Sequence, residues 1–400
     1  MFYHWNCKKL TYPGHRHWAY NLHKIMRIGI LLRKYFDFGG LQRDAVRFAE
    51  HLRKNDHEPV LVTSQTHTDK LQNLEMIHIA SRGWTNIQKE RNFIQACETV
   101  LESAGLDTCV AFSRVPHAPY QFVGDFCYKE YLQTTKRQKM SWLPRYRFML
   151  LRESQMFLNP ERKHYFFLNE HQLKTYRSFY RIPEASVTLL PPWGNQTFLN
   201  QPVETSYKTE LLQNLGISFE VKILLFVASN FHLKGLECAI RSLECNELSN
   251  AVLLVCGDDD HRGFAKFAAK RGLQNRVFFL GPRKDLPRLM RISDCLIHPA
   301  RREAAGMILI EALFSGLPVV CSEICGYAAE VQKAGGTVLP TDATNSDYAR
   351  SAAVSIRRSS EIEKTMSQWV KQNQSQSASS TMQRLIEGRF HNSTQSVGKA

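Results

Sequence analysis

Two glutamates eight positions apart, Glu303 and Glu311, frame the run of residues whose types and spacing best suit chemistry. Small residues follow the first of them, at Ala304, Ala305 and Gly306. We expect a strand to end shortly before this run and a helix to begin near Ala304. The free N–H groups and the positive dipole end of such a helix attract an anion, and small side chains let a diphosphate approach the backbone.

The same spacing indicates what the two glutamates could bind. At about 1.5 Å per residue, Glu303 and Glu311 would lie about 12 Å apart along the helix axis. This span fits a sugar at one end of a diphosphate and a ribose at the other, because carboxylates accept hydrogen bonds from sugar hydroxyls. The pattern also fits a first-turn glutamate that favours the helix dipole and a second glutamate on a solvated face.

A pair of glycines, Gly39 and Gly40, follows the first expected strand and opens a helix. Paired glycines let the backbone approach a ligand closely, and they are equally typical of a plain turn. The residues after them match neither a phosphate-binding P-loop nor the dinucleotide fingerprint. Asp44 lies one turn into the expected helix, where a carboxylate also favours the helix dipole.

Alternating apolar runs and helical patterns must position these residues. They predict parallel sheets covered by helices, because strand–helix–strand units connect parallel strands. We expect helices over 41–54 and near 87–104. The expected strands span 26–32, 60–63, 75–79, 108–112, 222–228, 251–256, 276–280, 294–297 and 317–321. The prediction is an α/β protein with two domains and a cleft between them.

The chain divides into four parts in this prediction, since 400 residues are too many for one ordinary core. Residues 1–25 lack a helix or strand period, and we expect them to be disordered or to precede the native start. An N-terminal domain covers 26–190, and a C-terminal nucleotide-binding domain covers 191–375. Residues 376–400 are rich in Ser and Gln, and we expect a polar tail with a short helix.

Composition indicates an acidic partner. The formal net charge is +15 and the sequence pI is about 9.4, which suits nucleic acid, an anionic membrane surface or a phosphorylated substrate. A solvated basic surface without a specific partner fits the charge as well. No apolar run reaches the roughly 18 residues that span a bilayer. The ten cysteines include no Cys-x-x-Cys pair, which favours a reduced, cytosolic protein.

Four motifs together resemble glycosyltransferase family 4, whose members have the GT-B fold of two Rossmann-like domains facing across a cleft. The motifs are Lys34–Asp44, His298–Ala300, Glu303–Gly306 with the run to Val320, and Cys325–Ala328. Within that family the chain is most similar to the bacterial lipopolysaccharide core glucosyltransferases. The resemblance runs from about 26 to 390 and is weak near 113–165.

The resemblance implies a hexosyltransferase that uses a UDP-sugar, retains the configuration at the anomeric carbon and needs no metal or other cofactor. It implies that Glu311 holds the ribose, that Glu303 holds the donor sugar, and that Asp44 serves the acceptor. Asp125 aligns with an acidic residue near the acceptor hydroxyl and could take its proton, although a loop-capping role is as plausible. The implied donor-binding residues are Gly39, Gly40, Arg283, Ala304, Ala305, Gly306 and Glu311.

The cationic motif departs from the family pattern. The family has Arg-Lys-Gly where this chain has Leu233, Lys234 and Gly235. Lys234 is the expected catalytic cation for the leaving diphosphate, and loss of the arginine should weaken transition-state stabilisation. His232 or Arg283 could substitute for it. His298 is expected to shape the loop before Glu303.

Two further segments bear on specificity. The loop 281–284 is similar to the family's base-reading loop but one residue longer. The segment 128–157 mixes cations with aromatic residues, which favours an anionic membrane surface over nucleic acid because the family's acceptor is a lipid-linked saccharide. We therefore expect a cytoplasmic enzyme bound peripherally to the inner face of the cytoplasmic membrane.

Other functions remain open at this point. Leu233 is the one feature that favours a non-catalytic GT-B protein, either a membrane-docked scaffold or a sugar-nucleotide sensor. A nucleotide-sugar epimerase would share the fold, and its product would stay attached to UDP. Release of UDP from UDP-glucose distinguishes the transferase from both alternatives.

Overall fold

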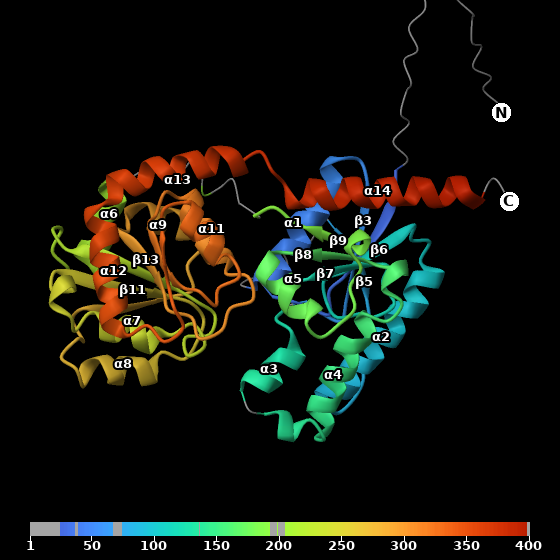
Figure 1. Ribbon diagram of the computed structural model, residues 1–400, viewed down its shortest axis with the longest axis horizontal. Coiled ribbons are helices and arrows are strands. Elements are labelled where there is room, and N and C mark those ends of the chain that lie inside the picture. Colours follow the sequence, from blue (N-terminus) through green and yellow to red (C-terminus); the bar gives the residue numbers. More distant parts are fainter. Residues whose placement is uncertain are drawn as a thin grey trace, which may run out of the picture.

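The chain folds into two parallel-sheet domains joined by a short linker and by a pair of C-terminal helices (Figure 1). The computed structural model describes residues 25–36, 39–66, 74–135, 137–192, 198 and 205–397. The expected extension at 1–25 lies outside these residues except for Ile25. No helix in the described part of the chain is both long and apolar enough to span a membrane.

The N-terminal domain contains a seven-stranded parallel sheet in the order β5-β3-β1-β6-β7-β8-β9. Its strands are β1 (Arg27–Leu31), β3 (Glu58–Thr63), β5 (Glu75–His78), β6 (Thr108–Ala111), β7 (Tyr120–Val123), β8 (His164–Phe167) and β9 (Val187–Leu189). The short strands β2 (Lys34–Tyr35) and β4 (Gln65–Thr66) pair separately. The predicted strands β1, β3, β5 and β6 are present, whereas β7, β8 and β9 were not predicted.

The C-terminal domain contains a six-stranded parallel sheet in the order β12-β11-β10-β13-β14-β15. Its strands are β10 (Lys222–Val227), β11 (Ala251–Cys256), β12 (Val277–Gly281), β13 (Cys295–His298), β14 (Val319–Ser322) and β15 (Thr337–Leu339). Both faces of this sheet are covered, so the central strands are continuous apolar runs, as parallel strands usually are. This domain matches the strand prediction, with β15 added.

Helices cover both sheets. In the N-terminal domain they are α1 (Gly40–Lys54), α2 (Asn86–Ser103), α3 (Tyr128–Thr134), α4 (Pro144–Met156) and α5 (Glu170–Arg177). In the C-terminal domain they are α6 (Thr205–Asn214), α7 (Leu236–Ser242), α8 (Arg262–Ala269), α9 (Leu286–Ile292), α10 (Met307–Phe314), α11 (Ala328–Lys333), α12 (Asn345–Arg357) and α13 (Ser359–Asn373). The two Rossmann-like domains confirm the predicted α/β fold.

Strand order locates the functional edge of each sheet. Each sheet reverses its direction of growth beside its first strand, between β1 and β6 and between β10 and β13. Ligands of such sheets bind beyond the carboxyl ends of the strands at this switch point. A ligand is therefore expected beside the loops that follow β1, β10 and β13.

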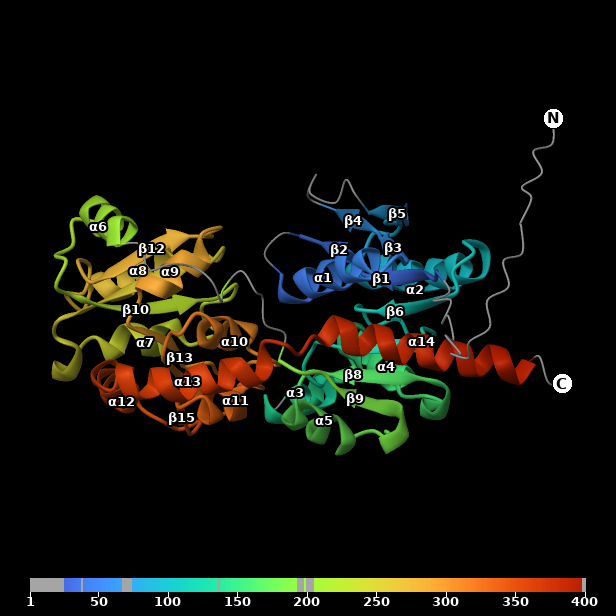
Figure 2. The ribbon, with the colours of Figure 1, turned by 90° about the horizontal axis from the view of Figure 1, so that it is seen from above.

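The C-terminal segment differs from the expectation. We expected a polar tail with a short helix, and the structure has a long helix there. The segment forms the 20-residue helix α14 (Ala378–Val397), which lies on the N-terminal domain after the chain crosses over from α13 on the C-terminal domain (Figures 1 and 2). Ala378, Met382 and Ile386 are fully buried at a spacing of four residues. The Nε2 atom of His57 also lies 2.7 Å from a carboxylate oxygen of Glu387. An apolar stripe within a Ser/Gln-rich segment thus anchors the end of the chain.

The helices α3 and α4 project from the N-terminal domain (Figure 1). Glu153 in α4 caps the N-terminus of α3, because its carboxylate accepts hydrogen bonds from the backbone N–H of Tyr128 (2.6 Å) and of Lys129 (3.0 Å). Arg152 is buried and lies 2.6 Å from a carboxylate oxygen of Glu90. Arg152 and Glu153 belong to the basic aromatic segment 128–157 but are buried, so they do not contribute to its surface charge. Lys136, another cation of that segment, lies outside the described residues.

Candidate active site in the interdomain cleft

A cleft of about 310 Å³ lies between the two domains, at the lower end of the volume range of small-molecule sites. Residues after β10, β11 and β13 line it on one side, and the N-terminus of α1 lines it on the other. Most residues predicted for the site lie on this surface, namely Gly40, Asp44, Lys234, Arg283, Glu303, Ala304, Ala305, Gly306 and Glu311. Gly39 and Asp125 do not lie on it.

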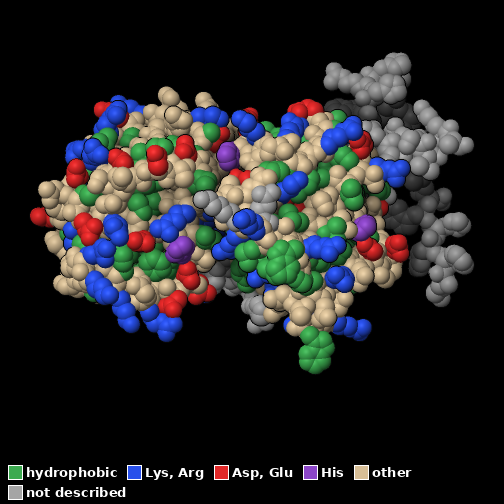
Figure 3. All heavy atoms as spheres, turned by 60° about the horizontal axis from the view of Figure 1, so that its bottom comes forward, with side chains coloured by type: hydrophobic (Ala, Val, Ile, Leu, Met, Phe, Trp, Pro, Cys, Tyr) green, Lys and Arg blue, Asp and Glu red, His purple; other side chains and the backbone are tan. Residues whose placement is uncertain are grey.

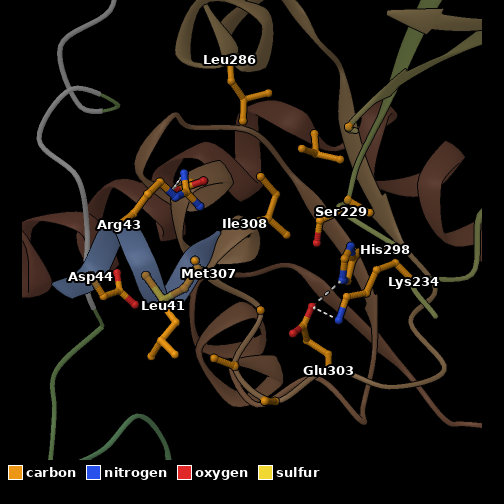
Figure 4. A pocket seen from close by; sticks show the side chains of 18 of the residues that line it. Leu41, Arg43, Asp44, Ser229, Lys234, Leu286, His298, Glu303, Met307 and Ile308 are labelled. Atoms are coloured by element: carbon orange, nitrogen blue, oxygen red, sulfur yellow. Dashed lines mark hydrogen bonds and ion pairs between the residues drawn. The ribbon is translucent and has the colours of Figure 1, made fainter. Parts of the chain in front are cut away.

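Lys234 and Glu303 form an ion pair at one end of the cleft (Figure 4). The Nζ atom of Lys234 lies 2.9 Å from Oε2 of Glu303 and donates to the backbone carbonyl of Arg302 at 2.9 Å. The Nε2 atom of His298 lies 3.3 Å from the same carboxylate oxygen. Burial would raise the pKa of Glu303, but the hydrogen bond with His298 and the charge of Lys234 hold it at about 2. Glu303 is therefore a permanent carboxylate at neutral pH, suited to accept hydrogen bonds.

The turn after Glu303 differs from the prediction. The helix α10 begins at Met307 rather than near Ala304, because Gly306 adopts a left-handed conformation with φ of +84° and ends the turn. No side chain caps this helix, so its first N–H groups remain available at the cleft. Since Glu303 is not part of the helix, the helical rise does not measure its distance from Glu311.

Glu311 lies farther along α10 and is fully buried (0% exposed). Its Oε1 atom is 3.1 Å from Nη1 of Arg43 and 3.7 Å from Nη2 of Arg47. Both arginines belong to α1, so the ion pairs cross from one domain to the other. Neither carboxylate oxygen accepts a hydrogen bond of good geometry from the described residues. Glu311 therefore keeps hydrogen-bonding capacity that a bound hydroxyl could use.

The N-terminus of α1 lies across the cleft from Met307 at the start of α10 (Figure 4), and Arg43 of α1 contacts Glu311. Gly40 opens the helix, and an added Cβ there would meet nothing within 4 Å. The helix has no side-chain cap and no acidic residue in its first turn. Asp44 therefore does not occupy the first-turn position at which a carboxylate favours the helix dipole. Asp44 is buried, and this burial raises the pKa of its carboxyl to about 7 despite the nearby Arg47 and Arg43.

Arg283 lines the cleft beside α9, but its guanidinium is occupied. Its Nε and Nη2 atoms donate to the two carboxylate oxygens of Asp285 at 2.8 and 2.6 Å. The hydroxyl of Tyr207 donates to the same carboxylate at 2.8 Å. This bidentate pair holds the loop 281–284 in place. Arg283 would have to leave Asp285 to replace the missing cation at Leu233.

The surroundings of Leu233 are also occupied. Its carbonyl accepts a hydrogen bond from the backbone N–H of Arg301 at 2.9 Å. The Nη1 atom of Arg301 lies 3.3 Å from Nε2 of His232, and its Nη2 lies 3.5 Å from Glu237. Neither Leu233 nor His232 lines the cleft. His232 therefore lies on the outer side of the loop that carries Lys234.

Asp125 lies at the edge of the site. Its carboxylate is 59% exposed and 3.8 Å from Nε of Arg114, while its backbone carbonyl accepts a hydrogen bond from Gln172 at 2.7 Å. The preceding residue, Gly124, does line the cleft. Asp125 could approach a ligand only from the open mouth of the cleft.

Sequence reasoning missed the residues that join the domains. Arg43 and Arg47 contact Glu311, and Asn169 of the N-terminal domain donates to the carbonyl of Ala304 at 3.3 Å. The spacing of Arg43 and Arg47, one helical turn apart, was the available indication of a shared partner. Nothing in the sequence marks Asn169.

Comparison with known proteins identifies this architecture. Residues 208–378 match the family of group 1 glycosyl transferases. The lipopolysaccharide glucosyltransferase WaaG of Escherichia coli (strain K12) is 31% identical over 320 residues, which cover 78% of this chain and 85% of that protein.

Comparison with solved structures agrees with the sequence comparison. The crystal structure of WaaG, a glycosyltransferase involved in lipopolysaccharide biosynthesis, has a TM-score of 0.79 at 28% identity, over 88% of this chain and 96% of that one. The Anabaena protein Alr3699/HepE in complex with UDP and glucose has a TM-score of 0.68 at 16% identity, over 92% and 100% of the two chains, and supports the fold alone. The fold, the cleft and these relatives together place the chain in the group 1 family of glycosyltransferases, with the GT-B fold.

Proposed function

We propose that this glycosyltransferase moves glucose from UDP-glucose to lipopolysaccharide core or another lipid-linked saccharide, with retention at the anomeric carbon. The observation that carries the proposal is the convergence of two uncapped helix N-termini, α1 and α10, with Lys234 on one cleft. Helix N-termini and a lysine suit a diphosphate. The names of the relatives point the same way: the Escherichia coli protein is a lipopolysaccharide glucosyltransferase, and the Anabaena protein is also described with UDP-glucose.

In this proposal the two glutamates bind different parts of the donor. Glu311, buried and still able to accept hydrogen bonds, holds the ribose hydroxyls. Glu303, kept ionised by Lys234 and His298, accepts hydrogen bonds from the hydroxyls of the donor sugar. The N–H groups of Ala305 and Gly306 and the backbone at Gly40 face the diphosphate, whereas Gly39 lies outside the cleft surface.

Lys234 acts on the leaving group. As the bond between the anomeric carbon and the diphosphate breaks, negative charge grows on the phosphate oxygens, and a fixed ammonium stabilises it. The acceptor hydroxyl loses its proton either to the departing phosphate or to a carboxylate such as Asp125. Asp44 lies on the acceptor side of α1. We propose that the reaction needs no metal ion, because the protein itself supplies the positive charge.

We further propose that the segment 128–157 docks on the inner face of the cytoplasmic membrane. On the face that carries α3 and α4, hydrophobic side chains lie beside lysines and arginines (Figure 3). Trp142 is 74% exposed between the two helices. Aromatic and apolar side chains insert at the headgroup level, and each nearby cation contributes about 1 kcal/mol with anionic lipids. The exposed cations and large hydrophobic residues among the described members of the segment are Lys129, Arg137, Lys139, Met140, Trp142, Arg145, Arg147 and Leu151.

Sedimentation with phosphatidylglycerol vesicles tests the docking. Replacing Trp142 with Ala together with Arg145 and Arg147 with Gln should abolish co-sedimentation. A matched control replaces Arg350 and Arg358, which lie on the surface of the C-terminal domain, with Gln. Equal binding by both variants would contradict the proposal.

A donor screen tests the reaction itself. The purified protein is incubated with deacylated lipopolysaccharide and UDP-glucose, UDP-galactose, UDP-N-acetylglucosamine or GDP-mannose, and nucleotide release is measured. We expect acceptor-dependent release of UDP with UDP-glucose. Tight UDP binding without release from any donor would favour a sensor or scaffold, and a sugar isomerised on UDP would favour an epimerase.

A further inference from the structure

A further contact between the domains lies one residue before Glu303. The guanidinium of Arg302, on the loop after β13, lies 4.1 Å from the ring centroid of Tyr131 and 5.3 Å from that of Phe126. Tyr131 belongs to α3 and Phe126 to the loop before it, both in the N-terminal domain. The two rings meet edge to face with centroids 5.5 Å apart. An arginine of one domain is thus stacked on an aromatic pair of the other.

Arg302 is half-buried, and no carboxylate among the described residues pairs with it. Its neighbour Arg301 differs, since its guanidinium contacts Glu237 and His232. Arg137 resembles Arg302: it lies 5.9 Å from the Tyr131 ring and donates to the Tyr131 hydroxyl at 2.7 Å, again without a carboxylate partner among the described residues. Two arginines that have no acidic partner in the described part of the chain therefore converge on one tyrosine.

This arrangement suits an anionic ligand. A guanidinium stacked on an aromatic ring is held in orientation while its N–H edge stays available, and that edge matches the oxygens of a phosphate. Arginine is also weakly hydrated, so it gives up water easily to such a partner. A half-buried cation that lacks a counter-charge is stabilised most by an anionic ligand that supplies this charge.

The position of Arg302 indicates which phosphate. Its backbone carbonyl accepts the hydrogen bond from Lys234, and the next residue is Glu303, so it adjoins the sugar end of the proposed donor site. Glu311 marks the ribose end. The acceptor hydroxyl must reach the anomeric carbon at the sugar end, so other groups of the acceptor lie nearby.

We propose that Arg302 and Arg137, stacked on Tyr131, bind a phosphate group carried by the saccharide acceptor. This proposal rests on the proposed transferase function. Arg302 and Arg137 recognise the acceptor in this proposal, whereas the other exposed residues of the segment 128–157, among them Trp142, Arg145 and Arg147, contact lipid headgroups.

Acceptor kinetics test the subsite. The acceptors are deacylated lipopolysaccharide lacking its outer-core hexoses and the same material after removal of phosphate with aqueous hydrogen fluoride. For Arg302→Gln we expect the acceptor KM to rise about tenfold on the phosphorylated acceptor only, and Arg302→Lys to recover part of the loss. Arg301→Gln, whose side chain points to Glu237, is the matched control and should leave both KM values unchanged.

Two outcomes of these kinetics overturn the proposal: an equal loss for Arg302→Gln on both acceptors, or no loss on either. If the wild-type enzyme transfers sugar to neither, the proposed function fails instead, and calorimetric binding of the phosphorylated saccharide still tests the subsite. Co-sedimentation with phosphatidylglycerol vesicles separates the two sources of phosphate. Arg302→Gln should sediment like the wild type, and a loss there would assign the arginine to lipid headgroups and overturn the proposal.

Discussion

Arg43 of α1 and Glu311 of α10 lie 3.1 Å apart across the cleft, joining the two domains through a carboxylate that is fully buried. The same carboxylate is the proposed ligand of the donor ribose. Donor binding and this ion pair therefore use the same oxygens. Removing water from a carboxylate is costly, so the buried carboxylate of Glu311 needs one of these two partners, the arginine or the ribose.

Replacement of Arg43 should strengthen nucleotide binding. In Arg43→Gln the carboxylate of Glu311 loses its nearest cation, so ribose hydroxyls no longer compete with that cation. We expect the Kd for UDP, measured by calorimetry, to fall about fivefold, or roughly 1 kcal/mol. Arg47→Gln, whose Nη2 lies 3.7 Å from Glu311, is the comparison and should have a smaller effect. A higher Kd in Arg43→Gln would mean that Arg43 binds the donor itself.

Replacement of Lys234 should slow the chemical step. A cation aimed at charge that develops in the transition state contributes about 10²-fold to 10³-fold to kcat, and less to ground-state binding. We expect Lys234→Ala to lower kcat by about 10²-fold with a smaller change in the donor KM. The exposed Lys284, which does not line the cleft, is the control. A loss confined to KM would assign Lys234 to ground-state binding alone.

Asp44 should make the folded state less stable as pH rises. Burial raises its pKa from 3.8 to about 7, so between these values the folded state keeps a proton that the unfolded state has lost. Stability therefore falls as pH rises through this window, by at most about 1.4 kcal/mol per unit. Asn carries no charge, so the free energy of unfolding of Asp44→Asn, relative to wild type, should increase from pH 5 to pH 8 in urea denaturation. An unchanged difference would mean that Asp44 is ionised at low cost.

Chelation should leave activity unchanged. If Lys234 and the N-termini of α1 and α10 supply the charge that the diphosphate needs, removal of divalent cations with EDTA should not lower kcat. Dialysis against EDTA followed by the UDP-release assay, with and without added Mg²⁺ or Mn²⁺, measures this. A loss of activity that metal restores would contradict the proposal that no metal is required.

The sequence predicted the C-terminal sheet better than the N-terminal one for a physical reason. Strands buried on both faces, such as β11, are continuous apolar runs, and such runs are readily predicted as buried strands. The strands β7, β8 and β9 contain Gln121, His164 and Thr188, polar residues whose hydrogen bonds form only in the folded chain. The apolar stripe of α14 was hidden because Ala378, Met382 and Ile386 stand among serines and glutamines.

The candidate site was also predictable only in part. Motifs local in sequence could be located in advance: Glu303–Gly306 and Gly40 line the cleft, Gly39 does not, and their roles in donor binding stay predictions. Contacts between domains could not be located in advance, since nothing local to Arg43 or Arg302 indicates Glu311 or Tyr131 as a partner. The start of α10 was misplaced by three residues because Gly306 adopts a left-handed conformation, which the residue types around it do not require.

The central claim is that this chain transfers a hexose from a UDP-sugar to a saccharide acceptor. The most direct test is nuclear magnetic resonance of the purified product after incubation with UDP-[13C]glucose and deacylated lipopolysaccharide. We expect a labelled α-glucosyl group on the acceptor and free UDP, both lost in Glu311→Ala at low donor concentration. Label that remains on UDP, or appears only as free glucose, would contradict it.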